Sequence, residues 1–344
     1  PRSRGLGDVY KRQQGYHVIG ATMRLWTYSD SCNMKHEGCC AESAVEDARR
    51  VCDKLGIDFY VMNFKDMFKD KVVDYFVDEY IHGRTPNPCI ACNKYLKFDA
   101  LLKKALAMGI DYVATGHYAK IEKGEDGKYI LRASEAVKKD QSYVLYNFTQ
   151  EQLAHTLMPL GGYNKDWVRQ KAEELGLGVA HKPDSQEICF VEDDDYAKFI
   201  TDYSGYKPKE GDILDVNGNV IGKHRGLIYY TIGQRKGIGA YGRPMFVMKI
   251  DAENNTITLG EKGMEFSNEL TAYDVNFVSG EFPKENMLIT AKVRYQAPPA
   301  AAMLCPQKDG TVKLMFPEPQ RAVTPGQAVV FYDGDIVLGG GTVL

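Results

Sequence analysis

The stretch Phe59–Ile81 (FYVMNFKDMFKDKVVDYFVDEYI) shows in one place the two sequence periods on which the fold depends. Phe59–Phe64 is a short apolar run typical of a strand, whereas Lys69–Ile81 repeats apolar residues three and four positions apart. The second spacing places those residues on one face of a helix, where they can be buried together. We therefore expect a strand followed by an amphipathic helix.

The same alternation continues on both sides of this stretch, from about residue 15 to residue 200. Before it, Tyr16–Met23 has the pattern of a strand and Ala44–Leu55 that of a helix closed by Gly56. After it, a helix that stops at Gly109 precedes Asp111–Thr115, a short buried strand. A β-α-β-α order predicts a doubly wound α/β fold, a parallel sheet covered by helices on both faces.

The pattern changes after about residue 205, where Gly, Asn and Asp punctuate short alternating runs. Pro244–Ile250 and Thr256–Leu259 have strand patterns that indicate a small β-rich domain. Leu288–Tyr295, Val312–Phe316 and Ala328–Tyr332 indicate a C-terminal β-barrel. The expected domains are residues 1–204 (α/β), 205–262 (β-rich) and 263–344 (barrel).

The charge of the chain is nearly balanced. It has 344 residues, with 43 Lys and Arg against 46 Asp and Glu, which gives a formal net charge of −3. This balance excludes a globally basic nucleic-acid coat but leaves room for a local phosphate-binding face. No apolar run approaches the ~18 residues that a membrane helix needs, and no signal peptide is evident, so we expect a cytoplasmic protein without membrane contact.

The use of the cysteines, of which the sequence has 8, depends on the compartment. A chain of this length can bury its own core and needs no disulfide staples. In the cytosol, a close pair such as Cys89 and Cys92 indicates a redox, sulfur-handling or metal site. The cysteines therefore favour a cytosolic enzyme with thiol chemistry.

The close pair lies in the segment Asn87–Asn93 (NPCIACN), which has the pattern of a helix start. Asn87 is a favourable N-cap and Pro88 suits the first helical position, so both cysteines should lie in the opening turns, on one face. Unpaired amides and the positive end of the helix dipole favour thiolate over thiol there. The plainer interpretation is a pair of buried apolar cysteines.

Further chemistry-bearing residues lie in three other segments. Ala114–Tyr118 (ATGHY) follows a predicted strand at the sheet edge where α/β folds bind ligands, which suits Gly116 to a nucleotide and His117 to a base or phosphate. Lys138–Ser142 (KKDQS) is a polar cluster, and Asp184–Phe190 (DSQEICF) places a further cysteine after a loop that can bring it to the first pair. The plainer interpretations are a structural histidine and a solvated turn.

Basic residues also gather locally, at Lys223–Arg225 and Arg235–Lys236, and Arg294 stands beside the stacking ring of Tyr295. Such pairs suit an RNA backbone and splayed bases, although most surface Lys and Arg only solubilise a protein. A local RNA-binding face is therefore compatible with the balanced net charge.

Taken together, these segments resemble the tRNA-specific 2-thiouridylase family. The resemblance runs from about Gly15 to the end of the chain and rests on several motifs in one order. The motifs are Gly83–Asn93 (GRTPNPCIACN), Lys97–Phe98, Ala114–Tyr118 (ATGHY), Lys139–Ser142 (KDQS), Asp184–Phe190 (DSQEICF), Tyr230–Gly237 (YTIGQRKG) and Lys292–Tyr295 (KVRY). The resemblance implies a Rossmann-like ATP-pyrophosphatase domain, similar to adenine-nucleotide alpha hydrolases, followed by a tRNA-binding β-rich domain and the barrel.

The activity that the resemblance implies is replacement of O2 by sulfur at the wobble uridine (position 34) of tRNA. ATP, with Mg²⁺, adenylates the uracil oxygen so that AMP departs in place of a poor leaving group, and a cysteine persulfide supplies the sulfur. A cysteine desulfurase or a sulfur-relay protein would load that persulfide. The base must leave its stack for this reaction, which is easier in an anticodon loop than in a duplex.

The resemblance also implies roles for individual residues. Cys189 carries the persulfide and Cys92 is the nucleophile that works with it, through a transient Cys92–Cys189 disulfide. The implied base pocket consists of Asn87, Pro88 and Cys89, and the implied ATP contacts are Met23 and Gly116. The residues implied to contact tRNA are His117, Lys139, Asp140, Gln141, Arg294, Tyr295 and Gln327.

One departure from the family pattern lies at the start of the sequence. The family opens with a strand and a Gly-rich pyrophosphate loop of the form Ser-Gly-Gly-Val-Asp-Ser, whose amides hold the ATP phosphates. Here Pro1–Gln13 (PRSRGLGDVYKRQ) stands in that place and is interpreted as foreign or misread sequence. The chain as written is therefore expected to lack a central strand and to bind ATP poorly, and a catalytically impaired tRNA-binding fragment is the alternative function.

A second departure is Cys89, which creates the Cys-x-x-Cys pair. Cys89, Cys92 and Cys189 are also suited to ligate three irons of a [4Fe–4S] cluster, which would make the chain a cluster-dependent tRNA thiolase. Another ATP-pyrophosphatase, such as an amidotransferase synthetase, is a third alternative, which shares the fold and needs neither Cys92 nor Cys189.

Overall fold

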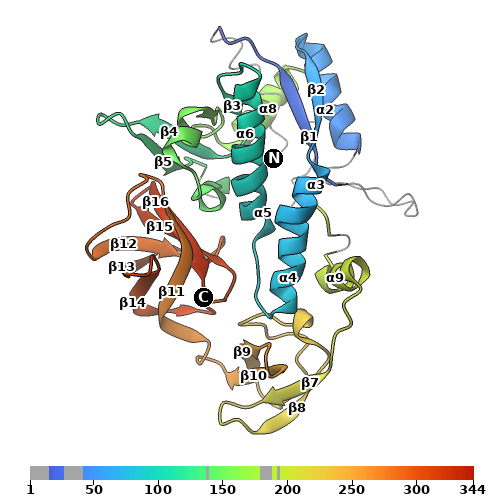
Figure 1. Ribbon diagram of the computed structural model, residues 1–344, viewed down its shortest axis with the longest axis vertical. Coiled ribbons are helices and arrows are strands. Elements are labelled where there is room, and N and C mark those ends of the chain that lie inside the picture. Colours follow the sequence, from blue (N-terminus) through green and yellow to red (C-terminus); the bar gives the residue numbers. More distant parts are fainter. Residues whose placement is uncertain (1–14, 27–41, 137–138, 179–187, 192–193) are drawn as a thin grey trace.

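The computed structural model describes residues 15–26, 42–136, 139–178, 188–191 and 194–344. Figure 1 shows an α/β body at the top, a β-barrel below it on the left, and a small sheet at the lower end. Helices of the α/β body run down the middle of the molecule. The expected α/β, β-rich and barrel parts are all present.

The α/β domain contains two pairs of parallel strands. β1 (Gly20–Arg24) pairs in parallel with β2 (Phe59–Asn63), and α2 (Glu42–Leu55) lies between them in the chain. β3 (Val113–Ala114) pairs in parallel with β6 (Thr156–Leu157). Parallel strands need such crossover connections, so these pairs confirm the expected α/β class.

The two parallel pairs are not joined to each other by a strand of the described ranges. Pro1–Gln13, the segment that stands in the place of the family's first strand and loop, lies outside those ranges. The absence of a central strand therefore stays a prediction from the sequence.

A nearly continuous helix follows β2 and confirms the helix expected at Lys69–Ile81. It consists of α3 (Lys65–Phe68), a π-helical segment (Lys69–Asp74) and α4 (Tyr75–Ile81). The residues that the apolar spacing places on one face are all buried: Val72, Val73, Phe76, Val77 and Tyr80. This face packs into the core of the α/β domain together with α9 (Tyr196–Ser204).

A second helix run carries the paired cysteines. α5 (Pro88–Ala91) continues as a π-helical segment (Cys92–Ala100) and as α6 (Leu101–Ala107), and the run stops before Gly109, as expected. π-helical turns are rare and occur frequently at functional sites. The shorter helical elements of this domain are a 3₁₀ turn (Ser142–Leu145), α7 (Gln150–Ala154) and α8 (Lys165–Glu174). No helix of the described ranges is long and apolar enough to cross a bilayer.

An antiparallel hairpin of β4 (Ala119–Lys123) and β5 (Tyr129–Ala133) leaves the α/β domain and joins the barrel. β5 pairs with β16 (Ile336–Val343) at Arg132 and Ile336. The β-α-β-α pattern did not predict this hairpin, because a local pattern does not report a partner that lies far away in the chain. The α/β domain and the barrel therefore share one sheet.

The middle domain is a small mixed sheet, which confirms the β-rich expectation. Its strands are β7 (Gly211–Leu214), β8 (Val220–His224), β9 (Met245–Asp251) and β10 (Thr256–Glu261), with a 3₁₀ turn at Leu227–Tyr229. The order is β8-β7-β10-β9, and β10 pairs in parallel with β7 and antiparallel with β9. Ile213, Val247, Ile257 and Leu259 are buried in its core.

The C-terminal strands close into a barrel, as expected. They are β11 (Phe266–Phe277), β12 (Met287–Lys292), β13 (Ala300–Pro306), β14 (Val312–Arg321), β15 (Ala328–Asp333) and β16. The order is β11-β14-β13-β12-β15-β16, and β16 pairs back with β11. The strand expected over Leu288–Tyr295 ends earlier, at Lys292, because the chain turns where the Ala297 amide donates to the Arg294 carbonyl (3.1 Å).

Candidate functional site

Helix α5 begins as the sequence predicts, with Asn87 as its N-cap. The side-chain oxygen of Asn87 accepts hydrogen bonds from the amides of Cys89 (3.1 Å) and Ile90 (3.3 Å), and Pro88 occupies the first helical position. These bonds satisfy amides that the helix itself leaves without partners. The two cysteines therefore stand in the opening turns, Cys89 exposed and Cys92 buried.

Cys92 and Cys189 belong to one apolar cluster, although they are far apart along the chain. Cys92 is a buried member of the cluster, and Cys189 and Met23 pack against it. Phe190, beside Cys189, is only 1% exposed, and its ring lies 5.3 Å from that of Phe76 on α4. Burial of Phe190 thus holds the Cys189 segment against the helices. Residues 184–187, the polar first part of the Asp184–Phe190 motif, lie outside the described ranges.

Gly116 and His117 follow β3, at the carboxyl end of a parallel strand, as expected. Thr115 extends the strand pairing through a bond from its amide to the Leu157 carbonyl (3.0 Å). His117 is 2% exposed, its Nδ1 lies 2.9 Å from the Thr115 hydroxyl, and its ring lies 5.6 Å from that of Phe98. The structure gives His117 a packed position in the core, and its contact with tRNA stays a prediction.

The turn Lys139–Ser142 is shaped by its own side chains. The Asp140 carboxylate accepts hydrogen bonds from the amide (3.2 Å) and the hydroxyl (2.7 Å) of Ser142. The side-chain oxygen of Gln141 accepts one from the Tyr118 amide (3.0 Å). The turn therefore lies against the segment that follows β3, and two of the predicted site segments are brought together.

A loop of the barrel lies over this turn. The Tyr295 hydroxyl donates to the Asp140 carbonyl (3.0 Å), and the Tyr295 ring lies 5.8 Å from that of Tyr143. Burial, followed by the charges of Asp140 and Cys89, raises the pKa of Tyr295 above its ordinary value. The loop with Arg294 and Tyr295 thus lies close to both the Asp140 turn and the exposed cysteine of α5.

Lys292, the first residue of the KVRY motif, is a basic residue at the same place that was not among the implied tRNA contacts. Its ammonium group lies 5.9 Å from the Tyr143 ring and 5.8 Å from the Tyr295 ring. Burial lowers the pKa of both Lys292 and Arg294, and the charge of Arg321 lowers that of Arg294 further. The Lys292–Tyr295 (KVRY) motif contained the signal for it.

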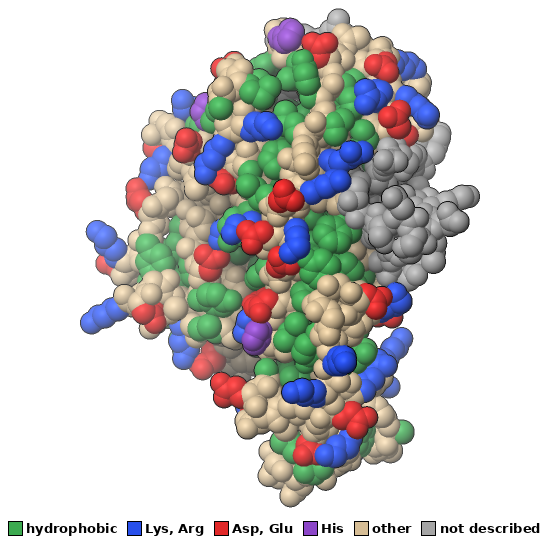
Figure 2. All heavy atoms as spheres, turned by 45° about the vertical axis from the view of Figure 1, so that its right-hand side comes forward, with side chains coloured by type: hydrophobic (Ala, Val, Ile, Leu, Met, Phe, Trp, Pro, Cys, Tyr) green, Lys and Arg blue, Asp and Glu red, His purple; other side chains and the backbone are tan. Residues whose placement is uncertain are grey.

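Gln327 and the basic residues of the middle domain lie elsewhere. The Gln327 side-chain nitrogen donates to the Thr85 carbonyl (2.7 Å), in the loop that enters α5. In the middle domain, His224 is buried, with its Nε2 2.9 Å from the Asn255 carbonyl. The exposed basic residues around it are Lys223, Arg225, Arg235 and Lys236. Figure 2 shows Lys and Arg side chains over this lower end of the molecule, interspersed with acidic ones.

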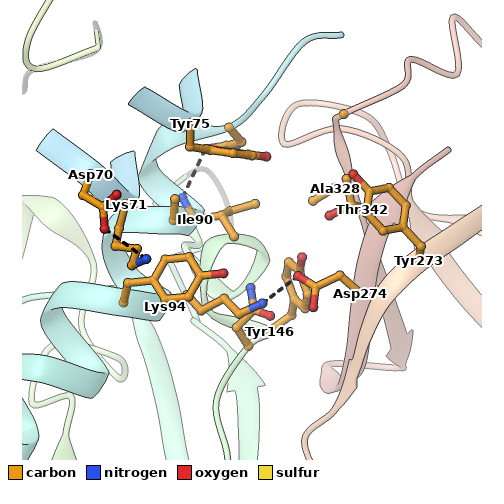
Figure 3. Close-up of a pocket in the computed structure, with 15 residues that line it drawn as sticks. Asp70, Lys71, Tyr75, Ile90, Lys94, Tyr146, Tyr273, Asp274, Ala328 and Thr342 are labelled. Carbon is orange, nitrogen blue, oxygen red and sulfur yellow. Dashed lines mark hydrogen bonds and ion pairs between the residues drawn. The ribbon is translucent and has the colours of Figure 1, made fainter. Parts of the chain in front are cut away.

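A cavity of about 480 Å³ opens beside the helix run of α5 (Figure 3). The residues of the run that line it are Asn87, Ile90, Ala91, Lys94 and Tyr95. Their spacing of three and four residues places them on one helix face, roughly opposite to the face of Cys89 and Cys92. The cavity is therefore not the meeting place of the cysteines.

The far wall of the cavity belongs largely to the barrel. Tyr273 and Asp274 of β11 and Thr342 of β16 line it. An ion pair crosses from the helix run to the barrel, with Lys94 Nζ 2.6 Å from the Asp274 carboxylate (Figure 3). Among the residues expected to form the base pocket, Asn87 alone borders this cavity in the described ranges.

The three cysteines named as alternative iron ligands do not form a metal site in the described ranges. Cys89 is exposed near Tyr295, whereas Cys92 is buried in the apolar cluster. Within the part of the chain that the structure describes, no group of three or more His, Cys, Asp or Glu side chains is placed to hold a metal ion. The donor set therefore does not fit the [4Fe–4S] alternative.

Three family models match the chain in order along its length. They are described as the tRNA methyl transferase HUP domain (residues 8–193), the tRNA methyl transferase PRC-barrel domain (residues 197–261) and the aminomethyltransferase beta-barrel domain (residues 267–343). The matched segments correspond to the α/β body, the small mixed sheet and the closed barrel of the structure.

Several curated proteins are similar to the chain over nearly its whole length. The tRNA-specific 2-thiouridylase MnmA of Acetivibrio thermocellus is 58% identical over 96% of this chain and 93% of that protein. The protein of the same name from Clostridioides difficile is 57% identical over 96% of this chain and 92% of that protein. The tRNA-specific 2-thiouridylase MnmA 1 of Thermoanaerobacter sp. is 56% identical, with the same coverage as the second.

Proposed function

This chain belongs to the tRNA-specific 2-thiouridylase family, and we propose that it replaces O2 of the wobble uridine of tRNA with sulfur in a reaction that consumes ATP. The observation that carries the proposal is the packing of Cys92 and Cys189 at one apolar cluster. Sulfur transfer needs a carrier and an attacking thiolate in one place. The shared cluster of Cys92 and Cys189, which come from separate segments of the chain, supports this pairing.

The first step activates the base. The uracil oxygen attacks the α-phosphate of ATP, pyrophosphate leaves, and C2 then carries an adenylate whose departure as AMP is easy. ATP enters as its Mg²⁺ complex, since a divalent cation offsets the charge of the phosphates. Met23 and Gly116 are the proposed nucleotide contacts, and their places near the carboxyl ends of β1 and β3 suit the edge where α/β sheets bind ligands.

The second step moves the sulfur. The terminal sulfur of a Cys189 persulfide attacks C2, and AMP leaves. The Cys92 thiolate then attacks Sγ of Cys189, which frees the sulfur on C2 and leaves a Cys92–Cys189 disulfide. A thiol reductant reopens the disulfide for the next turnover. Burial of Cys92 in an apolar cluster keeps water away from this exchange.

The proposed base pocket is the start of α5, formed by Asn87, Pro88 and Cys89. The Asn87 oxygen is engaged by two helix amides, so its side-chain nitrogen is the group left to donate to a uracil carbonyl. Cys89 is close enough to Tyr295 for its charge to raise the pKa of that residue. A flipped base at this place would lie between the helix start and an aromatic ring, as bases splayed from RNA loops do.

The proposed tRNA contacts come from several segments of the α/β domain and the barrel. The residues carried over from the family are His117, Lys139, Asp140, Gln141, Arg294, Tyr295 and Gln327, and we add Lys292 on the strength of its position. Lys292 and Arg294 are half-buried cations with lowered pKa values, so an approaching phosphate would meet charges that water screens poorly. The exposed basic residues of the middle domain are proposed as a separate contact with the RNA backbone.

The remaining partners follow from the chemistry. A cysteine desulfurase, directly or through a relay protein, is proposed to load sulfur on Cys189, since a chain-bound persulfide avoids the release of free sulfide. We place the reaction in the cytoplasm, where thiols stay reduced and tRNA is modified.

The test is thiolation of unmodified tRNA by the purified chain with ATP, cysteine and a cysteine desulfurase, followed by mass spectrometry of the nucleosides. Cys92→Ser and Cys189→Ser should each abolish 2-thiouridine, while Cys305→Ser, in a barrel strand, should leave it unchanged. Full activity of the Cys92 variant would refute the mechanism. Binding of tRNA without release of AMP would instead support the alternative, a tRNA-binding protein without catalysis.

A further inference from the structure

Thr85 of the α/β domain is bonded to groups of both other domains. It lies in the loop between α4 and α5, and its amide donates to the Pro325 carbonyl (2.9 Å) of the barrel. Its carbonyl accepts from the side chain of Gln327 (2.7 Å), also in the barrel. Its hydroxyl lies 3.4 Å from that of Thr231, in the middle domain. Both polar groups of the Thr85 backbone are thus bonded to the barrel, and the side chain contacts the third domain.

The residue before Thr85 is fixed from inside the α/β domain. Glu79, 5% exposed at the end of α4, forms a two-bonded ion pair with Arg84, in which Nε donates to Oε2 at 2.9 Å. The Arg84 amide also donates to the Glu79 carbonyl (2.9 Å). A buried carboxylate without such a partner would be strongly unfavourable, so the pair holds the loop in one geometry.

The barrel loop approaches this pair as closely as a glycine allows. A Cβ atom on Gly326 would lie 3.0 Å from Cβ of Arg84, 3.0 Å from the Thr85 nitrogen and 3.2 Å from Oε2 of Glu79. Gly326 also has a φ of 86°, which residues with side chains rarely adopt. A side chain here would push the barrel loop and the Thr85 loop apart.

The Thr85 loop leads directly to the cysteine-bearing helix. Asn87, the N-cap, is two residues on; Pro86 stands between them and Pro88 follows Asn87, and the φ angles of both prolines are fixed. On one face, α5 borders the 480 Å³ cavity, while Ile90 and Ala91 are buried in the cores on either side of the helix. The Thr85 loop therefore sets where a packed helix begins.

We propose that the Thr85 junction, defined as Glu79, Arg84, Thr85, Gly326 and Gln327, couples tRNA binding to the position of the helix that carries Cys89 and Cys92. Glu79, Arg84 and Gly326 act as positioning residues, through Asn87. The inference rests on the proposed function, because tRNA is the ligand that loads the barrel and the middle domain. Docking of the RNA moves the loops that hold Thr85, and α5 moves with it.

Two glycine substitutions separate this coupling from general loss of stability. Gly326→Ala introduces the close contacts described above, whereas Gly310→Ala, in the β13–β14 turn, meets nothing within 4 Å at a φ of 83°. Both variants carry the same backbone strain, so Gly310→Ala is the matched control. We expect Gly326→Ala to lower kcat about tenfold, with KM for tRNA changed less than twofold, and Gly310→Ala to change neither.

A second measurement follows the helix without catalysis. The rate at which a maleimide alkylates Cys89 is measured with and without tRNA, and tRNA affinity is measured by fluorescence anisotropy. In the unchanged chain, tRNA should alter the rate several-fold. In Gly326→Ala, the dissociation constant for tRNA should stay within threefold, while tRNA should no longer change the alkylation rate of Cys89. Glu79→Gln, which keeps the side-chain volume, should give the same two results.

The outcomes are distinguishable. An unchanged chain that binds no tRNA refutes the proposed function and the coupling with it. A chain that binds tRNA with no alteration of Cys89 labelling refutes the coupling alone. Equal effects of Gly326→Ala and Gly310→Ala on kcat and on Cys89 labelling also refute the coupling. Backbone strain alone, without the contacts at Gly326, would then explain the effects.

Discussion

Replacing Phe190 with alanine should destabilise the α/β domain and release the Cys189 segment. The Phe190 side chain is 1% exposed, and its ring lies 5.2 Å from that of Phe199, 5.3 Å from Phe76 and 5.7 Å from Phe68. Truncation of a buried Phe to Ala costs about 3–5 kcal/mol. Because aromatic rings surround this side chain on several sides, we expect a loss of about 4 kcal/mol.

Urea unfolding followed by circular dichroism measures this loss. With a slope of about 3 kcal/mol per M, a loss of about 4 kcal/mol lowers the midpoint by about 1.3 M. Phe282→Ala is the control, because the Phe282 side chain is 40% exposed and its removal should cost no more than about 0.5 kcal/mol.

The same variant tests the placement of Cys189. If burial of Phe190 holds the segment against the helices, Phe190→Ala should raise the alkylation rate of Cys189 in the folded protein and lower the yield of 2-thiouridine. A midpoint that falls by less than about 0.3 M, corresponding to under about 1 kcal/mol, together with an unchanged alkylation rate, would show that Phe190 does not anchor Cys189.

Three further changes have defined outcomes. Asn87→Ala should cost about 1 kcal/mol and most of the thiolation activity, whereas Asn164→Ala, which removes the N-cap bond of α8 to the Trp167 amide (2.8 Å), should cost a similar amount in thermal melting without loss of activity. Arg294→Ala should weaken tRNA binding and reduce the slope of log K against log salt by about 0.7–0.9, as measured by anisotropy titration; an unchanged slope would exclude a phosphate contact. Asp251→Asn should flatten the acid limb of stability, since bonds from the Asn254 amide and Lys249 lower the pKa of Asp251 from 3.8 to about 2. A lowered folded-state pKa stabilises the protein above about pH 4, and this contribution is lost as the pH falls toward 2. Urea midpoints of the unchanged chain and of Asp251→Asn, measured between pH 5 and pH 2, should therefore differ near pH 5 and coincide near pH 2.

Local structure was predictable wherever a short pattern determines it. The helix over Lys69–Ile81 follows from its apolar spacing, and the N-cap role of Asn87 follows from its side chain and the proline after it. The barrel strands follow from alternation between turn residues. Even there, the strand from Leu288 ends at Lys292, since the turn at Arg294 is set by a backbone bond that alternation does not reveal.

Long-range contacts were not predictable in the same way. Nothing in the sequence near Arg132 indicates that β5 pairs with β16, and nothing near Gln327 indicates that its side chain binds the Thr85 carbonyl. The sequence offers His117 as a ligand contact beside the plainer interpretation of a structural histidine, and the structure adds its burial beside Phe98. The joint placement of Cys92 and Cys189 came from the family resemblance, because their separation in the chain carries no information on distance.

The hairpin of β4 and β5 affects how the α/β domain would behave when it is expressed without the barrel. A fragment that stops near residue 204 would keep β5 but lose β16, its hydrogen-bonded neighbour at Arg132 and Ile336. The orphaned edge would offer bare amides and carbonyls to any other chain, which invites aggregation. Expression of the nucleotide-binding part by itself should therefore yield insoluble material, unless the hairpin is excised or the barrel is supplied in trans.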